Sequence, residues 1–167
     1  YISQKATLFS GTIASNVAFG DSNTQIANED VENAIKTAQA WEFVKNKESG
    51  VDSYVAQGGA NLSGGQKQRL SIARAIARKP EILIFDDSFS ALDYKTDKML
   101  RDALDKECKD STRIIVAQRI GTIRDADRII VLDEGKIVGQ GKHAELMQNC
   151  DVYRQIAYSQ LSKEELE

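Results

Sequence analysis

The stretch that decides the fold is "ILIFDDSFSALD", residues 82–93. Four apolar residues run directly into Asp86 and Asp87. A short unbroken apolar run predicts a strand buried on both faces. Paired carboxylates after such a strand are typical of a metal or phosphate site. The second acid raises a question, because glutamate would reach further than aspartate toward a water that it must polarise.

The segments around this strand alternate between helical and strand patterns. "SGGQ" at 63–66 matches a capping box, and the helix that follows ends at Pro80. This order predicts an α/β fold with ligands at the carboxyl ends of the strands. We expect helices at 29–47, 66–79, 94–109, 143–149 and 151–165, a loop at 48–62, a second buried strand at 113–118, and a hairpin at 128–141 around Glu134 and Gly135.

The composition is that of a soluble globular domain: 167 residues, 41% hydrophobic and 28% charged. A net charge of −3 argues against a nucleic-acid binder. Cys108 and Cys150 are far apart and predict reduced thiols rather than a metal site. No apolar run approaches the roughly 20 residues of a membrane helix, and no signal peptide is expected. Trp41 and His143 are interpreted as a packing residue and a surface residue at a helix start.

The segment "LSGGQKQR", residues 62–69, predicts an anion site. Two glycines at a helix start leave backbone N–H groups uncovered, and the helix dipole adds positive charge there. Ser63 adds a hydroxyl. A terminal phosphate is the ligand that such a turn fits best, although a capped helix with a flexible start would look the same.

These motifs resemble the nucleotide-binding domains of ABC transporters, in order and over essentially the whole chain. "LSGGQ" is similar to the family signature, "ILIFDD" to the Walker B strand, "SALD" at 90–93 to the D-loop and "SQ" at 3–4 to the Q-loop. "LFSGTIASNVAFG" and "YVAQGGANLSGG" resemble segments of the exporters. "ADRIIVLDEGKIVGQGKHAEL" resembles the C-terminal hairpin and helix.

The resemblance implies a role for each matching residue, with ATP and Mg²⁺ as cofactors. Asp86 and Gln4 would help to hold Mg²⁺, and Gln4 would also sense the attacking water. Asp87 stands where the family has a catalytic glutamate. Five residues are expected to grip the partner's ATP or to cross the dimer interface: Ser63, Gly64, Gly65, Gln66 and Asp93.

Two departures from the family pattern answer the opening question. Asp87 is one methylene shorter than glutamate, about 1.5 Å of reach. A misplacement of about 1 Å can cost around a hundredfold in rate, roughly 2.7 kcal/mol of barrier. Gln118 follows "RIIVA", where the family has a histidine that contacts the γ-phosphate. Together they resemble the degenerate half of a heterodimeric ABC exporter, which completes its partner's site with an intact signature.

The resemblance also implies how the chain is organised. Residues 1–11 would form the Q-loop segment, 12–78 a helical subdomain, 79–142 the Walker B, D-loop and switch region, and 143–167 the C-terminal helices. No G-x-x-x-x-G-K-[ST] loop is present, so we expect a partial P-loop NTPase-like ABC ATPase domain from a longer polypeptide. A transmembrane domain in that polypeptide would place the chain at the cytoplasmic face of the membrane. An isolated piece would be inactive and would expose apolar surface.

Three other interpretations stay open at this point. The first is a homodimeric exporter with weak, symmetric sites. The second is an ABC ATPase that acts on nucleic acid or ribosomes, against which the exporter-like segments 6–20 and 54–61 argue. The third is a regulatory nucleotide-binding module without transport.

Overall fold

We analysed a computed structural model that describes residues 1–20 and 26–160. The chain forms two compact units, residues 1–116 and 117–167. The fold is mixed helix and strand, as the sequence predicts. None of the described helices has the length and apolar character needed to cross a bilayer.

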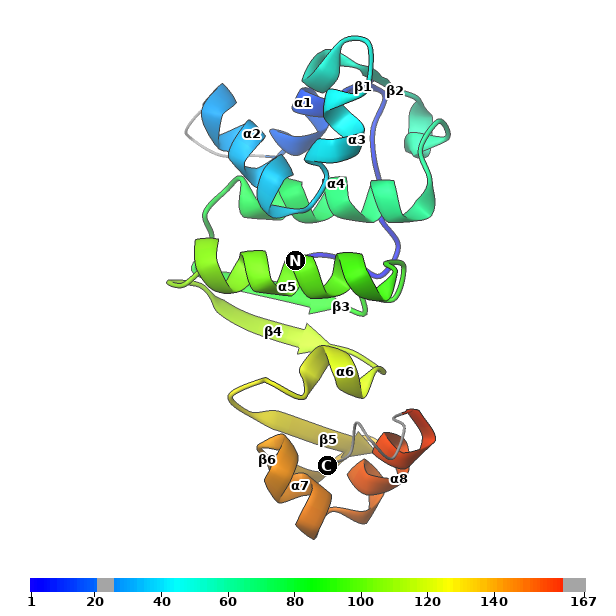
Figure 1. Ribbon diagram of the computed structural model, residues 1–167, viewed down its shortest axis with the longest axis vertical. Coiled ribbons are helices and arrows are strands. Elements are labelled where there is room, and N and C mark those ends of the chain that lie inside the picture. Colours follow the sequence, from blue (N-terminus) through cyan, green and yellow to red (C-terminus); the bar gives the residue numbers. More distant parts are fainter. Residues whose placement is uncertain (21–25, 161–167) are drawn as a thin grey trace. The chain divides into compact units, whose positions relative to one another are not determined.

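The first unit combines a mainly helical part with a small parallel sheet (Figure 1). Strand β3 pairs in parallel with β4, and Ile2 forms a parallel bridge to Phe85 of β3. The elements in chain order are β1 (Gly11–Thr12), α1 (Ile13–Val17), α2 (Asn28–Thr37), α3 (Trp41–Lys45), η1 (Gly50–Asp52), β2 (Tyr54–Val55), η2 (Gln57–Gly59), α4 (Gly64–Ile76), β3 (Ile82–Asp86), α5 (Tyr94–Glu107) and β4 (Thr112–Val116).

One hydrophobic core joins the helices and the sheet of this unit. Leu70 of α4, Phe85 of β3 and Leu104 of α5 are buried in the same cluster. Trp41 packs against its edge, as predicted, and Lys36 lies over the Trp41 ring at 4.9 Å. Helix α4 therefore belongs to the same packed body as the strand that ends at Asp86.

The second unit is a hairpin covered by helices. Its elements are α6 (Ile120–Ile123), β5 (Ile129–Asp133), β6 (Lys136–Gly141), α7 (His143–Asn149) and α8 (Asp151–Gln160). Strands β5 and β6 are antiparallel, and Glu134 and Gly135 take φ angles of 46° and 76° in the turn. This confirms the predicted hairpin. Residues 161–165, which were predicted to continue the last helix, lie outside the described residues.

The expected helix over 29–47 is wrong as one continuous element, because it breaks between α2 and α3. Gln39 has a left-handed φ of 57°, and the Ala40 N–H donates to the Ile35 carbonyl. Arg69 Nη1 of α4 donates to the Gln39 carbonyl at 2.6 Å, which satisfies the broken turn. The predicted loop at 48–62 also contains β2, which pairs with β1.

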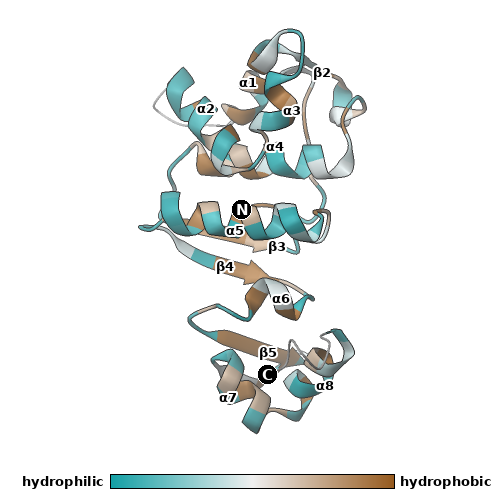
Figure 2. Ribbon diagram, viewed as in Figure 1, coloured by the Kyte–Doolittle hydropathy of each residue, from teal (hydrophilic) through white to brown (hydrophobic). Residues whose placement is uncertain are grey.

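The expectation that strand 113–118 is buried is wrong for this chain. Ile114 and Val116 of β4 are 48% and 53% exposed, although Figure 2 colours the end of this strand as hydrophobic. Strand β4 pairs with β3 along one edge, and no other strand among the described residues pairs with it. β3 is also less buried than predicted: Leu83 and Phe85 are buried, whereas Ile82 is exposed.

Two residues of α5 give a matched test of this packing. Leu104 is 1% exposed and Met99 is 47% exposed. We expect Leu104→Ala to destabilise the domain by about 2–5 kcal/mol, because it leaves a cavity in the core. Met99→Ala should change the free energy of unfolding by less than about 0.5 kcal/mol. Chemical denaturation of the two variants measures the difference, and equal losses would contradict the assigned orientation of α5.

Candidate functional site

The site begins at the carboxyl end of β3, where Asp86 is the last strand residue. Asp87 follows with a left-handed φ of 45°. Its N–H donates to the Val116 carbonyl at 2.8 Å. Its carbonyl accepts from the Ser90 hydroxyl at 2.7 Å and the Ser90 N–H at 3.3 Å. The backbone of Asp87 is therefore fixed on both sides of the acid.

The structure brings Gln4 and Asp87 together, although 83 residues separate them in the chain. Gln4 Nε2 donates to Asp87 Oδ2 at 2.9 Å. The neighbouring backbone explains the approach: the Ile2 N–H donates to Ile84 O at 2.7 Å, and the Asp86 N–H donates to Ile2 O at 2.9 Å. The segment that carries Gln4 thus runs beside β3 and delivers the amide to the strand end.

Asp86, the residue before Asp87, forms a hydrogen bond with a different residue. Tyr1 OH donates to Asp86 Oδ2 at 2.5 Å, and this hydrogen bond raises the pKa of Tyr1. The residues present fit Mg²⁺, because Asp86 and Gln4 offer the carboxylate and amide oxygens that hard cations prefer. Among the described residues no group of three or more His, Cys, Asp or Glu side chains converges. Proteins commonly hold Mg²⁺ through one or two carboxylates, with waters and phosphates completing the shell.

The LSGGQ turn forms the predicted capping box at the start of α4. Ser63 Oγ accepts from the Gln66 N–H at 3.3 Å, and the Ser63 N–H donates to Gln66 Oε1 at 3.0 Å. A methyl group at Gly64 would meet nothing within 4 Å, whereas one at Gly65 would lie 3.4 Å from the Ala91 carbonyl. Packing among the described residues therefore does not explain why residue 64 is glycine.

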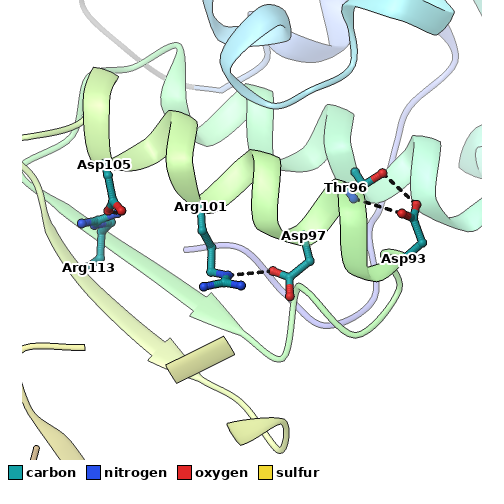
Figure 3. A network of polar contacts seen from close by, with 6 residues as sticks. All are labelled: Asp93, Thr96, Asp97, Arg101, Asp105 and Arg113. Atoms are coloured by element: carbon teal, nitrogen blue, oxygen red, sulfur yellow. Dashed lines mark hydrogen bonds and ion pairs between the residues drawn. The ribbon is translucent and has the colours of Figure 1, made fainter. Parts of the chain in front are cut away.

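Asp93 caps α5 in this structure, a local role that the sequence interpretation did not assign. Its carboxylate accepts from the Thr96 N–H at 3.0 Å and from Thr96 Oγ1 at 2.7 Å (Figure 3). These hydrogen bonds hold the pKa of Asp93 below its usual value. Further along α5, Asp97 pairs with Arg101 and Asp105 pairs with Arg113 of β4. The first pair lies within α5, and the second joins α5 to β4.

A comparison with protein families now identifies the chain. A sequence model of the family described as "ABC transporter" matches residues 1–90, more than half of its length. The chain belongs to the ABC transporter family. The fold is accordingly a partial ABC ATPase domain of the P-loop NTPase type.

Several proteins that this chain resembles carry names of ABC transporters, a flippase and an exporter. An uncharacterized ABC transporter ATP-binding protein of Mycobacterium tuberculosis is 46% identical over 160 residues, which cover 95% of this chain and 27% of that protein. The ATP-dependent lipid A-core flippase of Francisella tularensis is 40% identical over 96% of this chain and 26% of that protein. A bacterial Atm1-family ABC exporter solved with ATP bound matches at a TM-score of 0.89 with 34% identity. The match covers 97% of this chain and 28% of that chain. The chain spans about a quarter of the length of these relatives.

The remaining predicted site residue of this ABC domain, Gln118, lies in the second unit. Its carbonyl accepts from Gln160 Nε2 at 2.7 Å, and its side chain is exposed. Gln160 Oε1 in turn accepts from the Ile120 N–H at 2.9 Å, so α8 holds the turn that carries Gln118.

His143 has a more structural role than the predicted surface position. It is half-buried, and its Nδ1 lies 2.8 Å from the hydroxyl of buried Tyr153. Burial, together with the nearby Arg124, holds the pKa of His143 below its usual value. Both cysteines are free thiols, as expected, and burial raises the pKa of Cys108.

Sequence reasoning overlooked the side chains of α4 that reach the Q-loop segment. Gln68 donates to the Ser3 carbonyl, and Arg74 donates to the Thr7 and Asn16 carbonyls. A basic cluster in and just after α4 would ordinarily form a solvated helix face: Lys67, Arg69, Arg74, Arg78 and Lys79. Arg69 and Arg74 are nevertheless partly buried, and desolvation lowers the pKa of each. Gln68 and Arg74 are six residues apart, so the 3–4 spacing that groups residues on one helix face does not single them out in the sequence.

Proposed function

We propose that this chain is the ATP-binding and ATP-hydrolysing portion of an ABC exporter, and that its own site is degenerate. Its main catalytic contribution would be the LSGGQ turn, offered to ATP bound by a second, different nucleotide-binding domain. The proposal assigns residues 12–78 to the helical subdomain that carries this turn. A transmembrane domain, part of the same full-length polypeptide, would couple ATP turnover to export at the cytoplasmic face of the membrane.

The observation that carries the proposal is the open position at Gly64. Beyond its own helix, no described residue would lie within 4 Å of a methyl group there, yet the turn is ordered by the Ser63–Gln66 capping box. The first N–H groups of α4 have no acceptor within the helix and carry the positive end of its dipole. The Ser63 hydroxyl can donate to a phosphate oxygen while its oxygen accepts from Gln66. A preformed, uncovered turn of this kind suits a phosphate supplied by another domain.

The arrangement at Asp87 supports a weak acid site in the same chain. The carboxylate is short, its backbone is fixed, and Gln4 already donates to it at 2.9 Å. Asp87 cannot advance toward a water by moving its backbone, so the missing methylene is not compensated. Bound Mg²⁺ would supply charge stabilisation to the transferred phosphoryl group. Asp86 and Gln4 are the residues proposed to hold it.

Gln118, at the position where the family has a histidine, is proposed to weaken ATP hydrolysis further. A neutral amide can donate a hydrogen bond to a phosphate oxygen, but it cannot carry the positive charge of a protonated histidine. The partner would then be an ABC domain that keeps glutamate and histidine at these two positions. A net charge of −3 and the exporter relatives favour this assignment over a role on nucleic acid.

A glycine substitution tests the proposal with a matched control. Gly64→Ala should lower ATP turnover of the full-length complex by at least about tenfold, because the methyl group intrudes where the partner's phosphate docks. Gly121→Ala, in α6, also meets open space and should keep turnover within about twofold. Steady-state ATPase rates and melting temperatures of both variants are the measurements. If Gly64→Ala folds and hydrolyses ATP like the wild type, the LSGGQ turn is not a phosphate site.

A further inference from the structure

Gln68 is a buried polar residue of α4 that the proposed reaction does not yet use. Its side chain is 1% exposed. Its Nε2 donates to the Ser3 carbonyl at 3.1 Å, across 65 residues of sequence. A buried amide needs partners, since an unsatisfied one destabilises the fold. The hydrogen bond to Ser3 therefore fixes the backbone of the residue that immediately precedes Gln4.

Arg74 makes a second attachment from the same helix on the other side of Gln4. Its Nη1 donates to the Thr7 carbonyl at 2.8 Å, and its Nε donates to the Asn16 carbonyl at 2.7 Å. Asn16 is itself buried, and its side chain hydrogen-bonds the Phe9 backbone. Only residues 4–6 lie between the two attachments, so α4 holds the Q-loop segment from both ends.

The same helix begins at the LSGGQ turn. Gln68 follows Gly65 by three residues, which is less than one turn and about 4.5 Å along the axis. A rigid helix that shifts when its first turn grips a phosphate must carry Gln68 with it. The shift then reaches Ser3, Gln4 and, through the 2.9 Å hydrogen bond, the carboxylate of Asp87.

We propose that Gln68 is a positioning residue that couples the LSGGQ turn to the placement of Gln4 against Asp87. It would make the acid site of this chain sensitive to whether the partner's site is closed. The inference rests on the proposed function, because it takes the turn to bind the partner's phosphate. Gln68 is buried and would act through the Ser3 carbonyl.

Hydrogen exchange tests the coupling in the full-length complex with ATP and Mg²⁺. The peptide that covers residues 1–9 reports on the Q-loop segment. Ser63→Arg and Gln68→Met should each speed its exchange by about three- to tenfold, the net effect of one lost hydrogen bond or contact. The double variant should exchange no faster than either single variant, since both changes interrupt one route.

The controls separate coupling from misfolding and from a failure of the proposed function. Gln155→Met, at an exposed position of α8, should leave the peptide unchanged. Gln68→Leu also removes the donor without burying a charge, so it should match Gln68→Met. The coupling would be overturned if the two single-variant increases in exchange rate multiply in the double variant. It would also be overturned if either single variant leaves the exchange rate of peptide 1–9 unchanged. The ATPase rate of Ser63→Arg decides the proposed function independently of these exchange rates.

Discussion

Replacing Ser63 with arginine in the full-length complex is expected to lower ATP turnover at the partner's site by about 10²- to 10³-fold. The guanidinium fills the open space beside Gly64 and removes a hydroxyl that would donate to the γ-phosphate. Loss of one preorganised donor to a developing charge typically costs this much. Asp87→Ala should lower total turnover far less, because the acid that it removes belongs to the weak site.

The comparison is made on steady-state ATPase rates of the two variants in the same heterodimer. Ser63→Arg also loses the cap on α4, which is worth about 1 kcal/mol of helix stability, so melting temperatures must accompany the rates. Ser49→Arg, at an exposed position without a side-chain cap, serves as the matched control. A larger loss from Asp87→Ala would mean that the acid of this chain is the main base.

The second large effect is a gain, from the double substitution Asp87→Glu with Gln118→His. The glutamate restores about 1.5 Å of reach toward the attacking water. The histidine restores a side chain that can follow the charge developing on the γ-phosphate. Since both groups act on one transition state, we expect their effects not to add, and the pair to exceed the sum of the single gains. A rise on the order of a hundredfold over the single-site background is the expected scale.

Single-site turnover checks this expectation. The partner's own catalytic acid is removed, so that only the site containing Asp87 can report. Asp87→Asn with Gln118→His is the matched control, because it restores the histidine without an acid. If the double variant stays at background, the two departures are not what silences the site.

Local signals were enough to predict much of the fold. The capping box at Ser63, Pro80 and the apolar runs located α4, β3 and the C-terminal hairpin to within a few residues. These features depend on short-range chemistry, such as caps, turns and side-chain periodicity. The break at Gln39 was missed because its cause is tertiary: Arg69 of α4 accommodates the turn from 30 residues away.

The candidate site likewise has residues that the sequence predicts and contacts that only the structure shows. The sequence motifs named Gln4, Asp86 and Asp87, but only the packing of the Ile2 segment against β3 explains why Gln4 reaches Asp87. The burial of β4 was overestimated because an apolar run shows that a strand is hydrophobic but not whether another element packs against it. Gln68 went unnoticed because a glutamine inside a polar motif gives no sign in the sequence that it is buried.

The left-handed backbone at Asp87 bears on how mutational scans of this position should be read. Aspartate and asparagine adopt a positive φ more readily than alanine or glutamate, which lose about 1–2 kcal/mol there. An alanine scan would therefore mix the loss of a charge with the cost of a disfavoured main-chain conformation. Asparagine removes the charge and keeps the turn, the difference between alanine and glycine isolates the cost of the conformation, and glutamate must overcome that cost before its extra length can help. A variant library at residue 87 that omits asparagine and glycine would rank the substituted residues by how well they adopt the positive φ rather than by their catalytic chemistry.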